Sequence, residues 1–310
     1  MSSLVQAPAP TPNRHLERRL AEFVDRDAEM RRFCALLDSG EKPIMVVYGG
    51  TGMGKTSLLL RMVHECGLRK RLKSEVTWND TLPHDYMAVM RKIRDDVGVE
   101  HFKPFTDLIN YYTDATYKPK LEVTLVVPGG TNLEVASGLQ ARDSSIGDVA
   151  NVMFKDNMII VPRNDLGVPE PVRREQLTVR FVEGLRSATE SSPAAVLLDA
   201  TEKMSPDTCA WLWEQLLSPV RAGRLPNVRF VILGQRPPPE DRDWDDYVDR
   251  AELRALAVGD IFAYLAKRVP AESDETRRAL ANMIQTFTKG RPTDVAAAVD
   301  AYLKQSGGTA

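Results

Sequence analysis

The chain has 310 residues, which is room for about two domains. Hydrophobic residues make up 43% and charged residues 27%, a balance that excludes a wholly disordered chain and a collagen-like fibre. No apolar run approaches the roughly 20 residues of a membrane-spanning helix, so no membrane association is expected. Lys and Arg total 41 and Asp and Glu total 43, and the net charge of −2 provides no overall attraction to nucleic acid or anionic lipid.

The two ends of the chain and its cysteines indicate a cytoplasmic protein. Residues 1–17 are rich in Ala, Pro and Ser and lack the basic and apolar regions of a signal peptide, so they are expected to form a disordered leader. Residues 305–310 are expected to form a flexible tail. The cysteines are too widely spaced for a C-x-x-C site and are expected to be free thiols in a reducing compartment: Cys34, Cys66 and Cys209.

The first part of the chain alternates between strands and helices. Met30, Phe33, Cys34 and Leu37 recur at helical spacing and predict a helix from about residue 26 to 37. The apolar, β-branched run 43–48 predicts a buried parallel strand. Further elements are expected in chain order: a helix from Lys55 to about Glu65, a short strand at 76–78, and helices at 84–97 and 102–116.

Residues 118–171 interrupt this rhythm. The segment 121–127 alternates like a strand, and Gly, Asn, Asp and Ser punctuate the chain up to a second apolar run at 158–161. This pattern predicts a β-rich insertion, and an irregular surface excursion is the alternative.

The second part of the chain predicts a core followed by helices. Expected elements are a helix near 174–189, a strand at 194–199, a helix opened by Ser205 and Pro206, and a strand at 228–233. A Pro-rich and then acidic stretch marks a boundary near residue 240, and three apolar faces beyond it have helical spacing. The chain is therefore expected to be α/β, a three-layer αβα parallel sheet over residues 18–240, followed by a small all-helical lid over 241–304.

The most specific motif is a phosphate-binding loop. The segment 49–56 matches G-x-x-x-x-G-K-[ST] in full, with a predicted strand before it and a predicted helix after it. Glycines allow several backbone N–H groups to point at one anion, and the helix N-terminus adds positive potential. Lys55 is expected to reach the β- and γ-phosphates, and the hydroxyl of Thr56 to bind Mg²⁺. The expected phosphate-binding residues are Gly49, Gly50, Thr51, Gly52, Met53, Gly54, Lys55, Thr56 and Ser57.

Two carboxylates are candidates to complete this site. Asp199 closes the strand at 194–199 and is expected to be the second metal ligand, because such a carboxylate usually ends a neighbouring strand. Glu202 follows three residues later and could activate the attacking water. The alternatives are a simple polar strand end for Asp199 and a solvated loop residue for Glu202.

Arg236 is the candidate sensor of the γ-phosphate. It follows the strand at 228–233 and could stabilise negative charge there, the alternative being a surface Arg before a Pro-rich turn. No Asn-Lys-x-Asp guanine signature is present, so ATP is the expected nucleotide.

Several segments resemble a known family. The box 23–29, Phe-Val-Asp-Arg-Asp-Ala-Glu, resembles the hydrophobic-hydrophobic-Gly-Arg-Glu-x-Glu box that precedes the phosphate loop in STAND ATPases, signal transduction ATPases with numerous domains, which are related to AAA+ proteins. The segments ending in Asp199 and Arg236 are similar to the family's metal-binding and sensor strands. Residues 290–292, Gly-Arg-Pro, match the Gly-x-Pro motif of the family's lid. The alternative is a purely structural role, in which Gly290 ends one helix and Pro292 begins the next.

This resemblance covers roughly residues 22–304, except about 100–170. It implies that Val24, Arg26 and Pro292 lie on the adenine side of a bound nucleotide. The chain departs from the family pattern at Asp25, which replaces Gly, and at Ala200, which leaves Glu202 as the nearby catalytic carboxylate. The winged-helix domain expected after the family's lid does not follow Pro292 in this sequence.

The resemblance implies a slow ATPase that acts as a molecular switch in signalling, regulation or defence. ATP and Mg²⁺ would be its ligands, and nucleotide state would control binding of a protein partner or self-association. One alternative is a DNA-associated, origin-recognition-like AAA+ ATPase, for which a basic cluster is the best nucleic-acid candidate: Arg61, Arg69, Lys70, Arg71 and Lys73. A solvated charged face is the other interpretation of that cluster. A small-molecule kinase and a non-hydrolysing nucleotide-binding scaffold are further alternatives.

Overall fold

The computed structural model describes residues 26–79, 85–113, 124–126, 132–134, 168–238 and 242–306. The chain divides into two compact units, one comprising residues up to His101 and from Leu185 onward, the other comprising Phe102–Gly184. The expected leader 1–17, Val24, the run 158–161 and residues 307–310 of the expected tail lie outside the described residues.

The first unit contains a parallel five-stranded sheet in the order β2-β5-β6-β1-β7. Its strands are β1 Ile44–Tyr48, β2 Leu72–Thr77, β5 Ala194–Asp199, β6 Val228–Gly234 and β7 Val248–Glu252. The helices before Leu185 are α2 Asp27–Asp38, α3 Lys55–Leu68 and α4 Tyr86–Val97, with the 3₁₀ turn η1 Val99–Phe102 at the boundary. The segments between β5 and β7 are η2 Thr201–Lys203, α7 Pro206–Trp211, the π-helical η3 Leu212–Leu216, α8 Ser218–Arg221 and η4 Arg242–Trp244.

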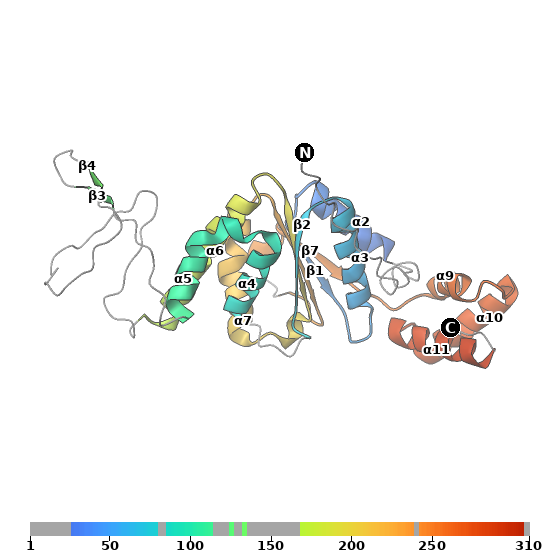
Figure 1. The fold of residues 1–310 in the computed structure, drawn as a ribbon. Coiled ribbons are helices and arrows are strands. Elements are labelled where there is room, and N and C mark those ends of the chain that lie inside the picture. Colours follow the sequence, from blue (N-terminus) through green and yellow to red (C-terminus); the bar gives the residue numbers. More distant parts are fainter. Residues whose placement is uncertain are drawn as a thin grey trace, which may run out of the picture. The chain divides into compact units, whose positions relative to one another are not determined.

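The sheet is covered on both faces, which makes three layers. In Figure 1, α2 and α3 lie on one face of the sheet, and α4 and α7 lie on the other. All six residues of β5 are buried, as a continuous apolar run predicts for a central parallel strand. Met45, Val47 and Leu197 pack in one core cluster with the apolar faces of α2 and α3. The expected α/β, three-layer architecture is therefore confirmed.

One strand contradicts the sequence-based expectation. The chain beyond residue 240 was expected to be helical, but β7 pairs in parallel with β1, and Tyr48 lies opposite Glu252. The burial of β7 is only partial, with Val248 and Ala251 buried and Glu252 exposed. The sheet thus continues beyond residue 240, and the helices of the lid begin at Val258.

The lid consists of α9 Val258–Arg268, α10 Asp274–Thr288 and α11 Pro292–Gln305. These helices share a core of their own, in which Leu256, Ile261, Ile284 and Val299 are buried. Pro292 is the first residue of α11 and Gly290 has φ +70°, so this Gly-Arg-Pro segment does end one helix and begin the next.

The second unit contains part of the expected insertion. Its helices are α5 Lys103–Thr113 and most of α6 Glu170–Ala188, and Phe102, Phe105 and Phe181 pack their rings together. β3 Thr124–Val126 pairs antiparallel with β4 Asn132–Glu134. The strand expected over 121–127 is confirmed for residues 124–126.

Candidate functional site

The phosphate loop joins β1 to α3 at the carboxyl edge of the sheet. Gly52 and Gly54 have φ of +81° and +83°, backbone conformations that favour glycine. Gly54 is the N-cap of α3, and no side chain caps this 14-residue helix. Its first-turn N–H groups are therefore directed at the concave side of the loop, where an anion would be held.

The order of the strands decides the fold. β6 lies between β1, which leads into the phosphate loop, and β5, which ends at Asp199. The fold is that of a P-loop NTPase. Asp199 was expected to end a neighbouring strand; β6 separates its strand from β1, and Asp199 nevertheless lies within hydrogen-bond distance of Thr56 at the start of α3.

Thr56 and Asp199 meet at the start of α3. Thr56 Oγ1 donates a hydrogen bond to Asp199 Oδ2 over 3.5 Å, and Asp199 is 3% exposed. Burial raises the pKa of Asp199, and the charge of Glu202 raises it further, while a backbone hydrogen bond from Ala200, the charge of Lys55 and the hydroxyl of Thr56 act to lower it. A buried carboxylate paired with a hydroxyl is a donor set of the kind that Mg²⁺ prefers.

This pair is small for a metal site made of protein alone. Among the described residues no group of three or more His, Cys, Asp or Glu side chains could hold a metal ion. Mg²⁺ commonly keeps several waters and is held by one or two protein oxygens together with substrate phosphates. Thr56 and Asp199 fit that mode of binding.

Lys55 lies within the loop. Its Nζ donates to the carbonyl oxygens of Gly49 at 2.6 Å and Gly50 at 3.0 Å. Burial lowers the pKa of Lys55, and the charges of Glu202 and Asp199 oppose this shift. Two neutral carbonyls thus hold the ammonium group in the loop, and the negative charges of Glu202 and Asp199 favour its charged form.

Glu202 lies in η2, the turn that follows β5. Its Oε1 accepts a hydrogen bond of 3.0 Å from Nε2 of Gln235, and Thr201 Oγ1 donates to Leu233 O at 3.1 Å. These two bonds attach η2 to the end of β6. Glu202 is exposed and lies near the start of the loop, because a Cβ placed on Gly234, whose carbonyl accepts the Gly49 N–H, would lie 3.8 Å from Glu202 Oε2. Its negative charge acts to raise the pKa values of Lys55 and Asp199.

The other predicted phosphate and sensor residues occupy the same edge of the sheet. Gly49 N–H donates to Gly234 O at 3.2 Å, so the loop begins against the end of β6. Arg236 follows β6, which pairs with β1 as expected, and its side chain is exposed. Met53 packs against the core under the loop, whereas Thr51 and Ser57 are exposed. The roles of these residues remain predictions.

The lid contacts the phosphate loop through the start of α11. Thr293 N–H donates to Gly52 O at 3.3 Å, and a Cβ placed on Gly54 would lie 3.8 Å from Cβ of Pro292. Pro292 was expected at the nucleotide from the Gly-x-Pro motif, and it does lie at the loop. Thr293 was not foreseen, because nothing in the sequence marks a backbone amide as a long-range donor.

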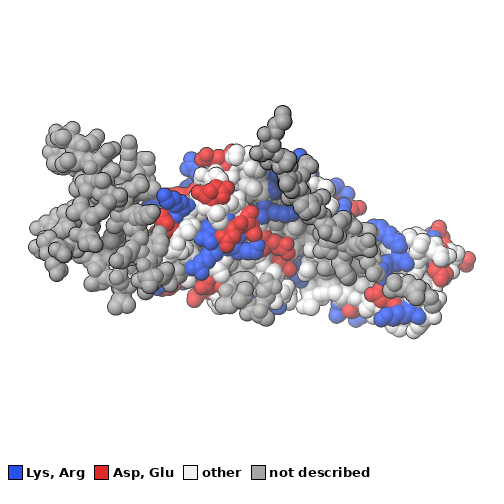
Figure 2. Space-filling view, viewed as in Figure 1, with Lys and Arg blue, Asp and Glu red and all other residues white. Residues whose placement is uncertain are grey.

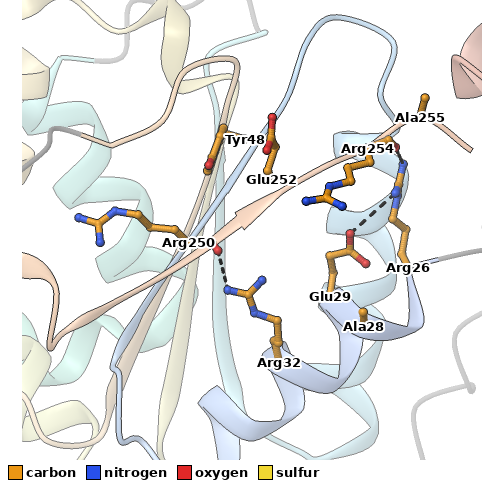
Figure 3. Close-up of a pocket in the computed structure, with 9 residues that line it drawn as sticks. All are labelled: Arg26, Ala28, Glu29, Arg32, Tyr48, Arg250, Glu252, Arg254 and Ala255. Carbon is orange, nitrogen blue, oxygen red and sulfur yellow. Dashed lines mark hydrogen bonds and ion pairs between the residues drawn. The ribbon is translucent and has the colours of Figure 1, made fainter.

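Arg26 lies beside the loop in an open pocket. Figure 3 shows its side chain among residues of α2 and of the segment after β7, including Glu29 and Arg254. Its Nη2 donates to Arg254 O at 2.8 Å and to Met53 O at 3.3 Å, and its Nη1 lies 3.7 Å from Glu29 Oε1. The structure thus brings Arg26 to the phosphate loop, although its contacts are with protein carbonyls.

Three of the five residues of the basic cluster form contacts within the protein. Arg69 forms ion pairs with Asp38 and Glu65, and Arg71 donates to the carbonyl oxygen of Leu37 at the end of α2. Lys73 Nζ donates to Val63 O at 3.2 Å. On the face viewed in Figure 2, basic and acidic side chains are interspersed and do not form one basic surface. These contacts favour a charged face of the protein over a nucleic-acid site as the interpretation of the cluster.

Two further expectations can be examined in the described part of the chain. No helix there is long and apolar enough to cross a lipid bilayer. Cys34, Cys66 and Cys209 are free thiols as predicted, and burial raises the pKa of Cys66 to about 11.

No protein-family model matches the chain, and no curated protein sequence matches it. Solved structures that are similar in fold include three different proteins. A STAND protein with a tetratricopeptide repeat sensor from Pyrococcus horikoshii is 12% identical, with 87% of this chain and 28% of that chain covered and a TM-score of 0.45. The Walker-type ATPase of Pyrococcus abyssi is 11% identical, covering 92% and 69%, with a TM-score of 0.48. Drosophila ORC bound to DNA is 14% identical, covering 94% and 65%, with a TM-score of 0.48. The chain thus spans less than a third of the length of the STAND protein.

Proposed function

We propose that the chain binds ATP with Mg²⁺ and hydrolyses it slowly, as a STAND-type molecular switch. The contact that carries this proposal is the one between Thr56 and Asp199, because it joins the phosphate loop to a buried carboxylate across an intervening strand. Burial disfavours the charged form of Asp199, and a cation bound beside it would offset that cost.

Each protein group has a distinct role in this proposal. The amides of the loop and of the first turn of α3 bind the phosphates, and Lys55 neutralises their charge. Thr56 and Asp199 hold Mg²⁺, which supplies charge stabilisation at the phosphoryl oxygens when bound. Glu202 orients a water and accepts its proton, and Arg236 stabilises charge at the γ-phosphate.

The lid supports the switch rather than a simple hydrolase. Thr293 and Pro292 contact the same loop that binds phosphate in this proposal, so phosphate binding and lid position affect each other. Nucleotide state would therefore control whether a protein partner, or a second copy of the chain, can bind. A DNA-associated role is disfavoured by the internal pairing of Arg69 and Arg71.

Calorimetry and sizing together test the proposal. Titration of ATP and ADP with Mg²⁺ should release measurable heat, and phosphate should accumulate over hours in a purified preparation. Light-scattering mass measurement with ADP and with a non-hydrolysable ATP analogue should then differ. If folded protein bound no nucleotide, the whole proposal would be refuted. ATP left intact over hours would favour the non-hydrolysing scaffold. The same mass with ADP and with the ATP analogue, with no partner bound in either state, would refute the switch.

A further inference from the structure

Arg26 is a buried cation that joins three separate segments. Its side chain is about 6% exposed, and the residue stands immediately before α2. Its guanidinium bonds Arg254 O and Met53 O and lies by the carboxylate of Glu29, whose side chain is 13% exposed. Burial of a charged group is costly unless it is paired and hydrogen-bonded, and these three partners meet that requirement.

One of these carbonyls belongs to the phosphate loop, and the other belongs to the segment that leads to the lid. Met53 is in the phosphate loop, directly before the N-cap of α3. Arg254 is in the segment 253–256, which we call the lid linker. The linker is bonded to the end of β1 by Leu253 N–H to Tyr48 O, and to the lid by Leu256 N–H to Gly290 O, both at 2.8 Å. One guanidinium thus connects the phosphate loop with the linker that leads to the lid.

The backbone of Arg26 is strained. Its φ of 120° and ψ of 19° lie in a region that residues with a Cβ rarely adopt. Such a conformation persists only where the surrounding contacts over-determine it, and it is typical of functional sites. Contacts to the loop and to the linker are among those that hold Arg26, together with two contacts to α2: the ion pair with Glu29 and the hydrogen bond that its carbonyl accepts from Met30 N–H.

We propose that Arg26 is a positioning residue that couples the phosphate loop to the lid linker, and that it acts through Met53 and Arg254. The inference rests on the proposed function and departs from the expectation that Arg26 binds the nucleotide itself. A guanidinium suits this position because it presents several N–H groups in a planar fork, whereas the ammonium of Lys is a point donor. A change at the loop on nucleotide binding is transmitted to the linker through these shared bonds.

Hydrogen exchange of the nucleotide-free protein tests the coupling directly. In Arg26→Ala, amides of residues 50–56 and 253–257 should exchange together, roughly 5-fold or more faster than in the wild type. Amides of β5 should keep their wild-type rates. Arg26→Lys should behave like Arg26→Ala in these two segments, although it keeps the charge and most of the stem. The matched control is Arg32→Ala. Arg32 is likewise an arginine with long-range hydrogen bonds, to Asp249 and to Arg250 O of β7, but it does not contact the phosphate loop.

Nucleotide binding provides the second readout. In the wild type, a bound ATP analogue should protect the amides of both the phosphate loop and the lid linker from exchange. In the Arg26 variants the analogue should still protect the loop, but protection of the linker should fall. These variants should also bind the analogue roughly 10-fold more weakly. Weaker binding with normal linker protection would show a direct nucleotide contact and overturn the proposal. The proposal would also be overturned if amide exchange rose throughout the sheet, or if Arg26→Lys left exchange in the loop and linker segments unchanged. A wild-type chain that binds no nucleotide would refute the proposed function, while the nucleotide-free comparison would still decide the role of Arg26.

Discussion

The backbone N–H of Thr293 donates a 3.3 Å hydrogen bond to the carbonyl oxygen of Gly52, so the first turn of α11 is bonded to the middle of the phosphate loop. The approach is close, because a Cβ placed on Gly52 would lie 2.5 Å from Thr293 Oγ1. Residues more than 200 positions apart in the sequence therefore depend on each other, and glycine at position 52 is required for both backbone shape and space.

Comparison of Gly52→Ala with a second glycine variant should separate the requirement for backbone shape from the requirement for space. The φ of +81° adds backbone strain of about 1 kcal/mol for Ala, and the contact with Thr293 adds a clash. We expect lower thermal stability and weaker nucleotide binding. The control is Gly223→Ala, since Gly223 has φ +69° and nothing within 4 Å of an added Cβ. Equal melting temperatures and nucleotide affinities for the two variants would show that the lid contact has no influence.

Substitution Lys55→Ala should abolish nucleotide binding. The ammonium group is already placed at the loop by Gly49 O and Gly50 O, and its removal leaves the phosphate charge without its principal cation. The loss should exceed roughly 100-fold in affinity, measured by calorimetry with Mg²⁺. Lys42→Ala is the control, because Lys42 is exposed and its Nζ donates to Asp245 O at 2.8 Å. Retained affinity in Lys55→Ala would move the phosphate site elsewhere.

The sequence predicted the site well where local chemistry determines structure. The apolar run of β1, the glycines of the loop and the start of α3 at Lys55 are each fixed by neighbouring residues. The same holds for α7, in which the Ser205 side chain accepts the Thr208 N–H and Pro206 follows at the first helical position.

The sequence failed where distant pairing determines structure. The sequence of β7 is Val-Asp-Arg-Ala-Glu, and its three charged residues give no strand pattern. Its conformation is determined by pairing with β1 at the edge of the sheet. The insertion of β6 between β1 and β5 is likewise a property of the whole sheet. The bonds of Arg26 to Met53 and Arg254 cross segments that are distant in sequence, and no local pattern predicts them.

Substitution Glu202→Gln should yield a protein that binds ATP and scarcely hydrolyses it. The amide keeps the size of the side chain and a hydrogen-bonding oxygen for Gln235, but it cannot accept a proton from water. We expect turnover to fall by roughly 10²- to 10⁴-fold with nucleotide affinity nearly unchanged. Glu214→Gln, on the exposed side of η3, serves as the control in the same phosphate-release assay. Undiminished turnover in Glu202→Gln would assign the proton acceptor to another group.

Substitution Asp199→Asn should raise stability and weaken magnesium-dependent binding. Because burial raises the pKa of Asp199 in the folded protein, the unfolded chain loses this proton at lower pH than the folded one. The ionised carboxylate therefore costs stability, and this cost grows as pH rises from about 4 through the raised folded pKa. Asn cannot ionise, so the difference in unfolding free energy between variant and wild type should widen from pH 4 to pH 7 without Mg²⁺.

Urea unfolding at several pH values measures this difference, and Asp207→Asn, near the exposed start of α7, controls for removal of a carboxylate. Added Mg²⁺ and nucleotide should narrow the gap, because they stabilise only the wild type through Asp199 and Thr56. A gap that is constant with pH would mean that Asp199 ionises alike in the folded and unfolded chains. In that case the folded protein would not disfavour the charged form of Asp199; the metal site itself would lose its support if Mg²⁺ and nucleotide left the gap unchanged.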